Sequence, residues 1–313
     1  MAKYVRACRK VFAATAVWLS LFPLLFTQSQ LHAQGCSDAG LCTLPPFKST
    51  PSLFKNALTL SQNVGFGEAN AVSFTYSLEG KFRLSKGPFL HLKIPFAVIT
   101  GNLGTSRGFG DVNFALTQTV CVGEKVQLNL TLGGKLSTDN ADKSRDGRPF
   151  PMAYQTSQGT DDLLAGISGR FEKWMFAAGY QHPFKRNKNG FLRSRWPGEP
   201  DAGLYFESNR LKRGDDLMVR AEKEFVWRQT KLFFGLSPIV RLQKDRIMDG
   251  TGADVSLTGS NGLTLNVTAG ANFPLARRLN LNVTGGAPVI SRDIQADGLR
   301  RGGALLTNLE FRI

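Results

Sequence analysis

Cysteine and histidine are scarce in this sequence. Its 313 residues include 4 Cys and 3 His, and four cysteines are too few for a scaffold held together by disulfides. Three histidines leave little material for most metal sites and for acid–base catalysis. A stretch that mimics the start of a calcium loop, residues 142–153, ends in Ala153 where a bidentate Glu is needed. We therefore expect no cofactor, no metal, no catalytic residues and a protein that is not an enzyme.

Long apolar runs are missing beyond residue 55, and the one near the N-terminus is short. Four basic residues precede an apolar run over residues 11–26, which leads to Leu31-His32-Ala33. This is the layout of a secretory signal peptide, and 16 residues fall short of the roughly 18 that a spanning helix needs. We predict a signal peptide at residues 1–33, cleaved after Ala33. A lipoprotein with Cys36 at its N-terminus and an uncleaved anchor remain alternatives.

Disorder is not expected, because charged residues make up only 20% of a chain that is rich in glycine, with 33 Gly. The formal net charge is +15, and without the four basic residues of the predicted signal peptide it is +11. A basic exported protein meets anionic lipopolysaccharide, anionic solutes or nucleic acid. No basic helix or aromatic RNA motif is present, so we expect no nucleic-acid partner.

Past residue 55 the apolar residues recur with period two, which is typical of β-strands. From Ala71 to Leu84, for example, apolar and aromatic residues alternate with Ser, Thr, Glu, Lys and Arg. The pattern predicts twelve strands, at residues 56–64, 71–84, 89–99, 110–121, 125–137, 161–171, 173–182, 215–226, 230–242, 262–273, 278–288 and 303–313.

Strand length and connection length indicate the fold class. Most predicted strands run ten to fourteen residues, whereas globular strands average about five or six and tilted membrane-spanning strands need about 9 to 11. The connections alternate between short and long, the longest at residues 138–160 and 183–214. This alternation is typical of outer-membrane barrels, with short periplasmic turns and long outer loops. We predict an all-β transmembrane antiparallel β-barrel of about 12 strands at residues 56–313, after a periplasmic segment at 34–55. A secreted soluble β-sandwich is the alternative.

Aromatic residues gather near the predicted strand ends, as the two membrane interfaces favour. Eight lie near the short turns, namely Phe82, Phe89, Phe171, Trp174, Phe225, Trp227, Phe273 and Phe311, and two, Tyr180 and Phe184, lie near an outer end. The chain also ends in an apolar, aromatic-containing strand, and we expect such a strand to be recognised by the barrel assembly machinery.

Two glycine-rich strand entries suggest a family. Gly108-Phe109-Gly110-Asp111-Val112 resembles the Gly-Leu-Gly-Asp signature of the outer-membrane barrels named after the meta-pathway of phenol degradation, with Phe109 where Leu is commoner. Gly159-Thr160-Asp161 looks like the second glycine-rich strand entry of that family. The resemblance covers roughly residues 70–313. It implies a barrel of about twelve strands, porin-like or transporter-like, that admits small or hydrophobic compounds.

Charged residues of both signs fall on the predicted inner face. They are Glu79, Lys81, Arg83, Lys93, Asp111, Lys135, Asp162, Arg170, Arg220, Glu222, Glu224, Arg241, Glu310 and Arg312. A barrel of about twelve strands leaves a narrow interior. These residues either fill it as a network of salt bridges or form a charged constriction that selects small polar or anionic solutes. For the second interpretation the candidate residues at mid-strand height are chiefly Lys81, Lys93, Lys135, Arg220 and Arg241.

The loop at residues 183–214 carries the strongest charge bias. Its basic residues are Lys185, Arg186, Lys188, Arg193, Arg195, Arg210, Lys212 and Arg213. They either meet lipopolysaccharide phosphates as part of a solvated outer loop or belong to a lid folded into the mouth.

Cysteine and histidine allow three further predictions. Cys36 and Cys42 are six residues apart in an oxidising compartment and are candidates for a disulfide, while we expect Cys121 to be a lone thiol at a periplasmic turn. Some twelve-stranded barrels resemble phospholipases with a lipid-facing Ser–His pair. Here His91 is expected to point inward and His182 to lie at an outer strand end, and neither shows a Ser or acid partner in the sequence.

Taken together, the sequence predicts a monomeric channel in the outer membrane of a Gram-negative cell for passive uptake of small solutes. Its expected partners are outer-membrane lipid and lipopolysaccharide, the barrel assembly machinery and a small-molecule solute. The alternatives are a structural or adhesion barrel with a plugged lumen, uptake of hydrophobic or aromatic compounds and, least favoured, a phospholipase-like enzyme.

Overall fold

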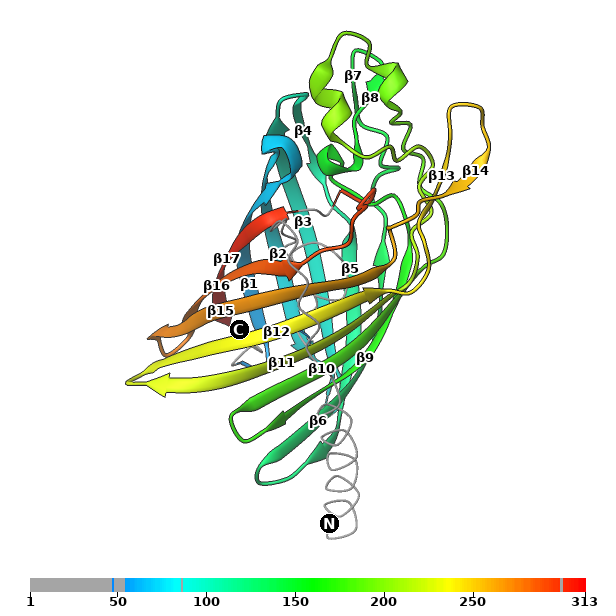
Figure 1. Ribbon diagram of the computed structural model, residues 1–313. Coiled ribbons are helices and arrows are strands. Elements are labelled where there is room, and N and C mark those ends of the chain that lie inside the picture. Colours follow the sequence, from blue (N-terminus) through cyan, green and yellow to red (C-terminus); the bar gives the residue numbers. More distant parts are fainter. Residues whose placement is uncertain (1–46, 48–53, 86, 299–300) are drawn as a thin grey trace.

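The wall of the molecule is a closed antiparallel sheet, shown as a computed structural model in Figure 1. The structure describes residue 47 and residues 54–85, 87–298 and 301–313. Twelve strands form the ring: β1 (Ala57–Gly67), β2 (Val72–Arg83), β3 (Phe89–Gly101), β5 (Val112–Val122), β6 (Val126–Leu136), β9 (Asp162–Phe171), β10 (Trp174–Pro183), β11 (Asp216–Trp227), β12 (Thr230–Arg241), β15 (Gly262–Ala276), β16 (Leu279–Ile290) and β17 (Arg301–Arg312).

The ring closes between the first and last of these strands. β1 pairs with β17 from Ala57 opposite Arg312 to Gly67 opposite Arg301, and it pairs with β2 on its other side. Closure leaves no strand of the ring with an unpaired edge, as the hydrocarbon layer of a membrane requires. The twelve predicted strands are thus confirmed in number and order, with ends that differ by up to three residues.

One strand was not predicted. β4 (Gly104–Phe109) folds back on the outer part of β3, and β5 takes over as the partner of β3 further inward. The sequence from 104 to 109 gave no signal because Gly-Thr-Ser-Arg-Gly-Phe lacks alternating apolar residues. The chain steps from β4 to β5 at Gly110, whose N–H donates to the carbonyl of Pro95 at 2.9 Å.

The two faces of the ring differ in polarity. Leu132 and Phe234, on the outer face, expose 61% and 54% of their surface. Their neighbours along the same strands, such as Thr131 and Lys135, are buried on the inner face. A soluble β-sandwich hides its apolar face between sheets, whereas here that face points outward and the polar face is enclosed. The sandwich alternative is therefore wrong, and the barrel is of the membrane-spanning type.

The inner end of the barrel has tight turns. Two residues connect β9 to β10, β11 to β12 and β15 to β16. Glu172 and Arg228 open the first two of these turns with φ of 52° and 55°, the conformation that two-residue hairpins demand. The predicted short turns therefore all lie at one end of the barrel.

The outer end is covered by folded loops, which we call the roof: residues 137–161, 183–215, 242–261 and 291–298. Its short elements are β7 (Ser144–Arg145), β8 (Arg148–Pro149), β13 (Arg246–Met248), β14 (Asp254–Ser256) and the 3-10 turns η4 (Met152–Tyr154), η5 (Arg193–Arg195) and η6 (Pro200–Leu204). A further 3-10 turn, η3 (Glu68–Asn70), joins β1 to β2 beside the roof. Figure 1 shows the roof rising above the ring.

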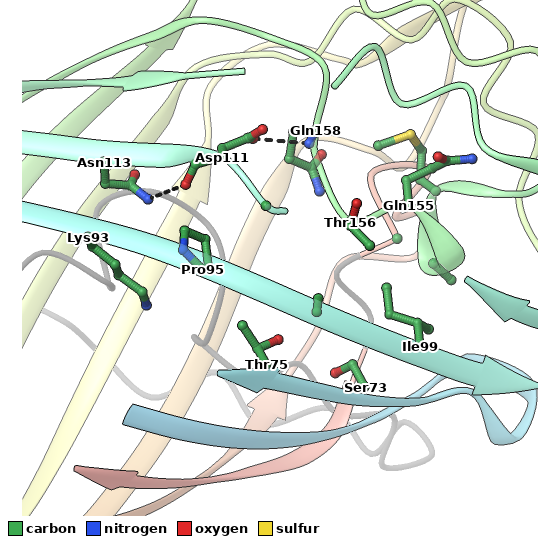
Figure 2. A pocket seen from close by; sticks show the side chains of 15 residues that line it. Ser73, Thr75, Lys93, Pro95, Ile99, Asp111, Asn113, Gln155, Thr156 and Gln158 are labelled. Atoms are coloured by element: carbon green, nitrogen blue, oxygen red, sulfur yellow. Dashed lines mark hydrogen bonds between the residues drawn. The ribbon is translucent and has the colours of Figure 1, made fainter. Parts of the chain in front are cut away.

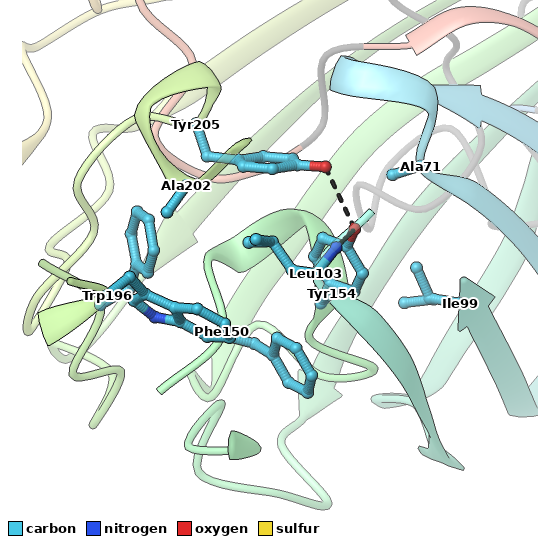
Figure 3. Packing of buried hydrophobic residues seen from close by; sticks show 9 residues of the cluster. Ala71, Ile99, Leu103, Phe150, Tyr154, Trp196, Ala202 and Tyr205 are labelled. Atoms are coloured by element: carbon cyan, nitrogen blue, oxygen red, sulfur yellow. Dashed lines mark hydrogen bonds between the residues drawn. The ribbon is translucent and has the colours of Figure 1, made fainter. Parts of the chain in front are cut away.

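The roof has a hydrophobic core of its own. Phe150 stacks on Tyr154 with ring centroids 5.0 Å apart, and the hydroxyls of Tyr154 and Tyr205 are 3.1 Å apart (Figure 3). Ile99 of β3 belongs to the same buried cluster. These contacts fix long loops of the roof to the rim of the barrel. Among the described residues, no helix is long and apolar enough to cross a membrane.

Candidate functional site: the lumen and its roof

The predicted lumen charges lie at different heights in the barrel. Glu79, Lys93, Lys135, Arg220, Glu222, Arg241 and Glu310 are all buried on the inner face, as are Asp111 and Asp162. Lys135 and Arg241 lie at the outer ends of their strands, whereas Lys93 and Arg220 are nearer the middle. The alternation along a strand predicts whether a side chain lies on the inner or the outer face of the sheet. How far the residue lies from the mouth depends on where the strand meets the roof, which the alternation does not predict.

Two of the predicted cations lie near the inner end. Arg83 is exposed at the last position of β2, and its guanidinium lies 5.6 Å from the centre of the Phe89 ring. Lys81 is half-buried, with its ammonium 4.8 Å from the same ring centre. The expectation that Lys81, Lys135 and Arg241 sit at mid-strand height is therefore wrong.

A buried network of charges joins the wall to the roof. We call it the charge network; it consists of Lys135, Arg213, Arg241, Arg292, Asp111, Asp162, Asp216, Asp245 and Asp297. The Lys135 ammonium lies 3.0 Å from Asp111 and 3.1 Å from Asp162. Arg213, from the roof, reaches Asp162 at 3.3 Å and Asp216 at 3.2 Å. The first half of the network thus ties the loop before β11 to the wall.

Arg241 is the centre of the second half. Its guanidinium lies 2.6 Å from Asp216 on the neighbouring strand and 2.9 Å from Asp297 in the last roof segment, and it also bonds Asp245. Arg292 lies 3.4 Å from Asp297. Removing one partner of a buried ion pair costs about 3–5 kcal/mol, because an uncompensated charge stays behind. Arg241 therefore holds three roof and wall carboxylates in place.

The pKa values of two buried roof carboxylates are shifted in opposite directions. Burial alone would raise the pKa of Asp297, but the guanidiniums of Arg292, Arg241 and Arg213 lower it below its ordinary value. Burial raises the pKa of Asp245, the positive charge of Arg241 opposes this, and the negative charge of Asp297 raises it further. Asp297 is thus the firmly ionised member of the pair.

The two glycine-rich entries meet where roof and wall join. Asp111 accepts hydrogen bonds from the Ser157 hydroxyl and, at 3.0 Å, from the backbone N–H of Gln158. A Cβ on Gly110 would lie 2.9 Å from the carbonyl oxygen of Thr156. Gly159 has φ of 67°, a conformation that favours glycine. The first glycine-rich motif, through Asp111, therefore holds the segment that leads into the second motif at Gly159.

The remaining motif residues lie at the same rim. A Cβ on Gly108 would lie 2.9 Å from the ammonium of Lys143. Asp161 accepts hydrogen bonds from the Ser137 N–H at 2.9 Å and from Lys185 at 2.7 Å. The bond from Lys185 is the main reason that the pKa of Asp161 falls to about 2. The motifs thus position roof segments.

Part of the lumen wall carries uncharged polar residues that the sequence analysis did not select. Their side chains are Asn, Ser and Thr, buried on the inner faces of β15, β16, β17, β1 and β2: Thr264, Asn266, Thr268, Asn272, Asn280, Asn282, Asn308, Ser61, Asn63, Ser73, Thr75 and Ser77. Several of their polar atoms, including Oδ1 of Asn266 and Oγ1 of Thr264, have no hydrogen-bond partner among the described residues. The repeated Asn at alternate positions, as in Asn280-Leu-Asn282, was the available signal.

An apolar patch interrupts the polar lumen. Phe47 is fully buried in a cluster with Ala115, Leu164, Met218 and other residues of the wall. The Arg220 guanidinium donates a hydrogen bond to the carbonyl of Phe47 at 2.6 Å. This residue of the segment expected in the periplasm thus lies inside the barrel. The predicted signal peptide, residues 1–33, lies outside the described residues.

Cys121 corrects one prediction. It lies on β5 near the inner end of the barrel and is disulfide-bonded, so the expected lone thiol is wrong. The position of a cysteine on a strand does not predict whether it is a free thiol or part of a disulfide, because that depends on a second cysteine distant in the sequence. Cys36 and Cys42, the predicted pair, lie outside the described residues.

The basic residues of the 183–214 loop fall into two groups. Lys188, Arg193, Arg195, Arg210 and Lys212 are exposed on the roof, as is Lys185, which pairs with Asp161, while Arg186 is half-buried and pairs with Asp254. Arg213 is different: it is 3% exposed and belongs to the charge network. It lies only three residues before Asp216, where β11 begins on the wall.

The histidines show one predicted and one unexpected placement. His91 is buried on the inner face, as expected. His182 lies 2.7 Å from Asp215, which also accepts a hydrogen bond from the Tyr180 hydroxyl at 2.6 Å. The expectation that His182 has no acid partner is therefore wrong, since Asp215 comes from the next strand entry. No serine hydroxyl bonds this pair among the described residues, and in that part of the chain no group of three His, Cys, Asp or Glu could hold a metal.

The comparisons with known proteins agree with this architecture. No protein-family model matches the chain, and no curated protein matches its sequence. Among solved structures the chain is similar to the COG4313 outer membrane channel from Pseudomonas putida F1, with a TM-score of 0.53 and 15% identity over 84% of this chain and 99% of that one. The chain has the fold of an outer-membrane β-barrel.

Two porins are also similar to this outer-membrane barrel. The KdgM porin has a TM-score of 0.44 and 7% identity, covering 82% of this chain and 99% of that one. The NanC porin has a TM-score of 0.47 and 4% identity, covering 82% of this chain and 100% of that one.

Proposed function

We propose that this barrel is a channel in the outer membrane of a Gram-negative cell and admits small polar solutes. The observation that carries the proposal is the enclosed polar face of a closed ring whose apolar face points outward. Such a wall makes a water-compatible path through lipid. The uncharged arc of Asn, Ser and Thr suits solutes that bond through hydroxyl or amide groups.

The roof makes this a gated channel in our proposal. Roof segments lie over the outer mouth, and the charge network holds them to the wall through Arg213 and Arg241, while Arg292 joins two roof segments to each other. Passage of a solute through the mouth then requires these segments to move. The same network favours a second candidate function, a structural barrel whose lumen stays plugged. In that case the salt bridges would simply fill the interior.

The proposal extends to the partners of the barrel, its export and its family. The exposed cations of the roof, such as Lys188 and Lys212, are suited to bind the phosphates of lipopolysaccharide. The apolar residues on the outer face of the ring are suited to contact outer-membrane lipid. We propose a monomer that is exported by the predicted signal peptide and inserted by the barrel assembly machinery. It acts without enzymatic activity or nucleic acid. We also propose that the chain belongs to the family of outer-membrane barrels named after the meta-pathway of phenol degradation. The hydrogen bond from the Gln158 N–H to Asp111, which connects the two glycine-rich motifs, supports this.

Reconstitution into planar bilayers tests the proposal. We expect discrete single-channel currents that become more frequent when the charge network is weakened. A reversal potential measured in asymmetric KCl gives the ion preference. If bilayers that contain correctly inserted protein remain silent, even after the network is weakened, the structural barrel replaces the channel. Phospholipid hydrolysis by the purified protein would instead restore the enzyme as a candidate.

A further inference from the structure

A cavity lies inside the barrel between the wall and the roof. Its wall side is formed by β2, β3 and the start of β5, and its roof side by residues 152–158 and Gly298 (Figure 2). The empty space is about 650 Å³, including its opening to solvent. The enclosed part is small, so a fitting occupant has only a few non-hydrogen atoms.

The cavity is lined by polar groups that lack partners. Oδ1 of Asn113, Oε1 of Gln158 and Oγ1 of Thr156 are buried without a hydrogen-bond partner among the described residues. Asn113 and Gln158 expose only 5% and 9% of their surface. Buried polar groups are nearly always hydrogen-bonded, so three unpaired ones around one cavity call for a bonded occupant. The two amide oxygens are acceptors, and an occupant must therefore present donors.

The charges beside the cavity are largely balanced. Asp111 is paired with Lys135 at 3.0 Å. Lys93 lies 3.8 Å from Glu79, a long ion pair that leaves ammonium protons for another acceptor. The lining thus combines acceptor amides, the hydroxyls of Ser73 and Thr75 and one ammonium. This set matches a molecule rich in hydroxyl groups, to which a carboxylate can be added at Lys93.

We propose that this cavity is a binding site for short polyols and hydroxy acids of about the size of glycerol. The hydroxyl groups of the solute donate to Asn113 and Gln158 and bond the Thr156 hydroxyl, and a carboxylate, where present, is held by Lys93. The site lies at the end of the uncharged arc of the lumen. The inference rests on the proposed channel function and names the solute class that the channel binds beneath its roof.

Ligand-observed saturation-transfer NMR on the full-length protein tests the site directly. The protein is held in an amine-oxide detergent, whose head group has no hydroxyls. Three probes are titrated: glycerol, glycerate and propionate, which has a carboxylate and no hydroxyl. We expect glycerol and glycerate to bind, glycerate more tightly, and propionate to give no saturable signal. Saturable binding by propionate alone, or by none of the probes, overturns the proposal.

Matched variants show whether binding occurs in this cavity. Thr156→Val keeps the shape of the side chain and removes its hydroxyl, and loss of one hydrogen bond predicts an affinity for glycerol about fivefold to tenfold weaker. Thr258→Val makes the same change at an exposed threonine of the roof, outside the lumen, and it should leave binding unchanged. Equal loss in both variants, or in neither, contradicts the assignment.

A filling variant covers the case in which Thr156→Val does not fold. Ala97→Leu places extra bulk on the buried inner face of β3, where Ala97 lines the cavity. It should abolish glycerol binding in protein that retains the heat-dependent gel mobility of a folded barrel. Retained binding overturns the proposal. A protein that conducts in bilayers but binds no glycerol loses this inference and keeps its proposed function, whereas binding without conductance removes the channel.

Discussion

Two arcs of the lumen wall use polar residues in different ways. On the arc from β5 to β12, the outer strand ends carry charges such as Lys135, Asp162 and Arg241, and these are paired with one another and with the roof. On the arc from β15 through β17 to β2, Asn, Ser and Thr replace them, and several polar atoms lack partners among the described residues. The charged side chains hold the roof, and in the proposed channel the uncharged ones are available to solutes.

The arcs also differ in where charge occurs. On the uncharged arc, Glu79 and Glu310 lie toward the inner end of their strands, away from the roof. The buried carboxylates on the wall strands of this arc thus lie away from the mouth.

The largest expected effect comes from Arg241→Ala on the charged arc. It leaves Asp216, Asp245 and Asp297 close together without their guanidinium, at a cost of about 3–5 kcal/mol. We expect the roof to detach while the ring stays folded. Limited trypsin digestion should cut the roof rapidly in this variant and slowly in the native protein. Thr258→Ala, at an exposed roof residue that is not a trypsin site, is the control. Equal protection of all three proteins would contradict the role of the network.

Phe47→Ala tests the apolar patch, which lies on the inner face of the charged arc. Removing a fully buried phenylalanine costs about 3 kcal/mol, so we expect residue 47 to leave the lumen more often. The measurement is channel conductance, which should rise. Phe184→Ala, at an exposed aromatic outside the lumen, should change nothing. An unchanged conductance would show that Phe47 does not narrow the path.

On the uncharged arc, Thr264→Val should change the free energy of unfolding by less than about 1 kcal/mol, with either sign. Its hydroxyl has no partner among the described residues, and replacing an unpaired polar group by an apolar one of equal shape is nearly neutral. Thermal unfolding followed by circular dichroism measures this. A loss as large as that of Arg241→Ala would mean that both arcs are structural.

The smallest effect concerns pH at the rim of the roof. The pKa of Asp161 is lowered from 3.8 to about 2, mainly by its bond from Lys185. A lowered pKa means that the carboxylate stabilises the fold above pH 3.8 and that this contribution is lost as the pH falls toward 2. Solvent screening keeps it small, because the side chains of both Asp161 and Lys185 are partly exposed. Asp161→Asn should reduce the difference in melting temperature between pH 5 and pH 2.5, and an unchanged difference would exclude this pair as its source.

The ring could be predicted from the sequence because it obeys local rules. Period-two alternation gives the strands and their faces, and turn length gives the two ends, without knowledge of distant contacts. The pairing at the outer end of β3 is an exception. There β4 takes the place of β5 as the partner of β3, and β4 could not be predicted because it has no apolar alternation. Closure itself followed from the need to pair every backbone group in lipid.

The roof could not be predicted in the same way. Arg213 looked like its exposed neighbours in the 183–214 loop, but its partners Asp162 and Asp216 become neighbours only after the barrel closes. The pairing of His182 with Asp215 has the same origin. Gly159 and Asp111 were found as motifs, yet their contact across the rim depends on a loop fold that no periodicity encodes.

Single-channel recording of the native protein beside Arg241→Ala tests the central claim most directly. The account predicts brief, infrequent openings for the native protein and frequent or sustained openings for the variant, with ion currents through a polar lumen in both. Equal currents in the two proteins, or silence in both despite confirmed insertion, would contradict a channel gated by its roof.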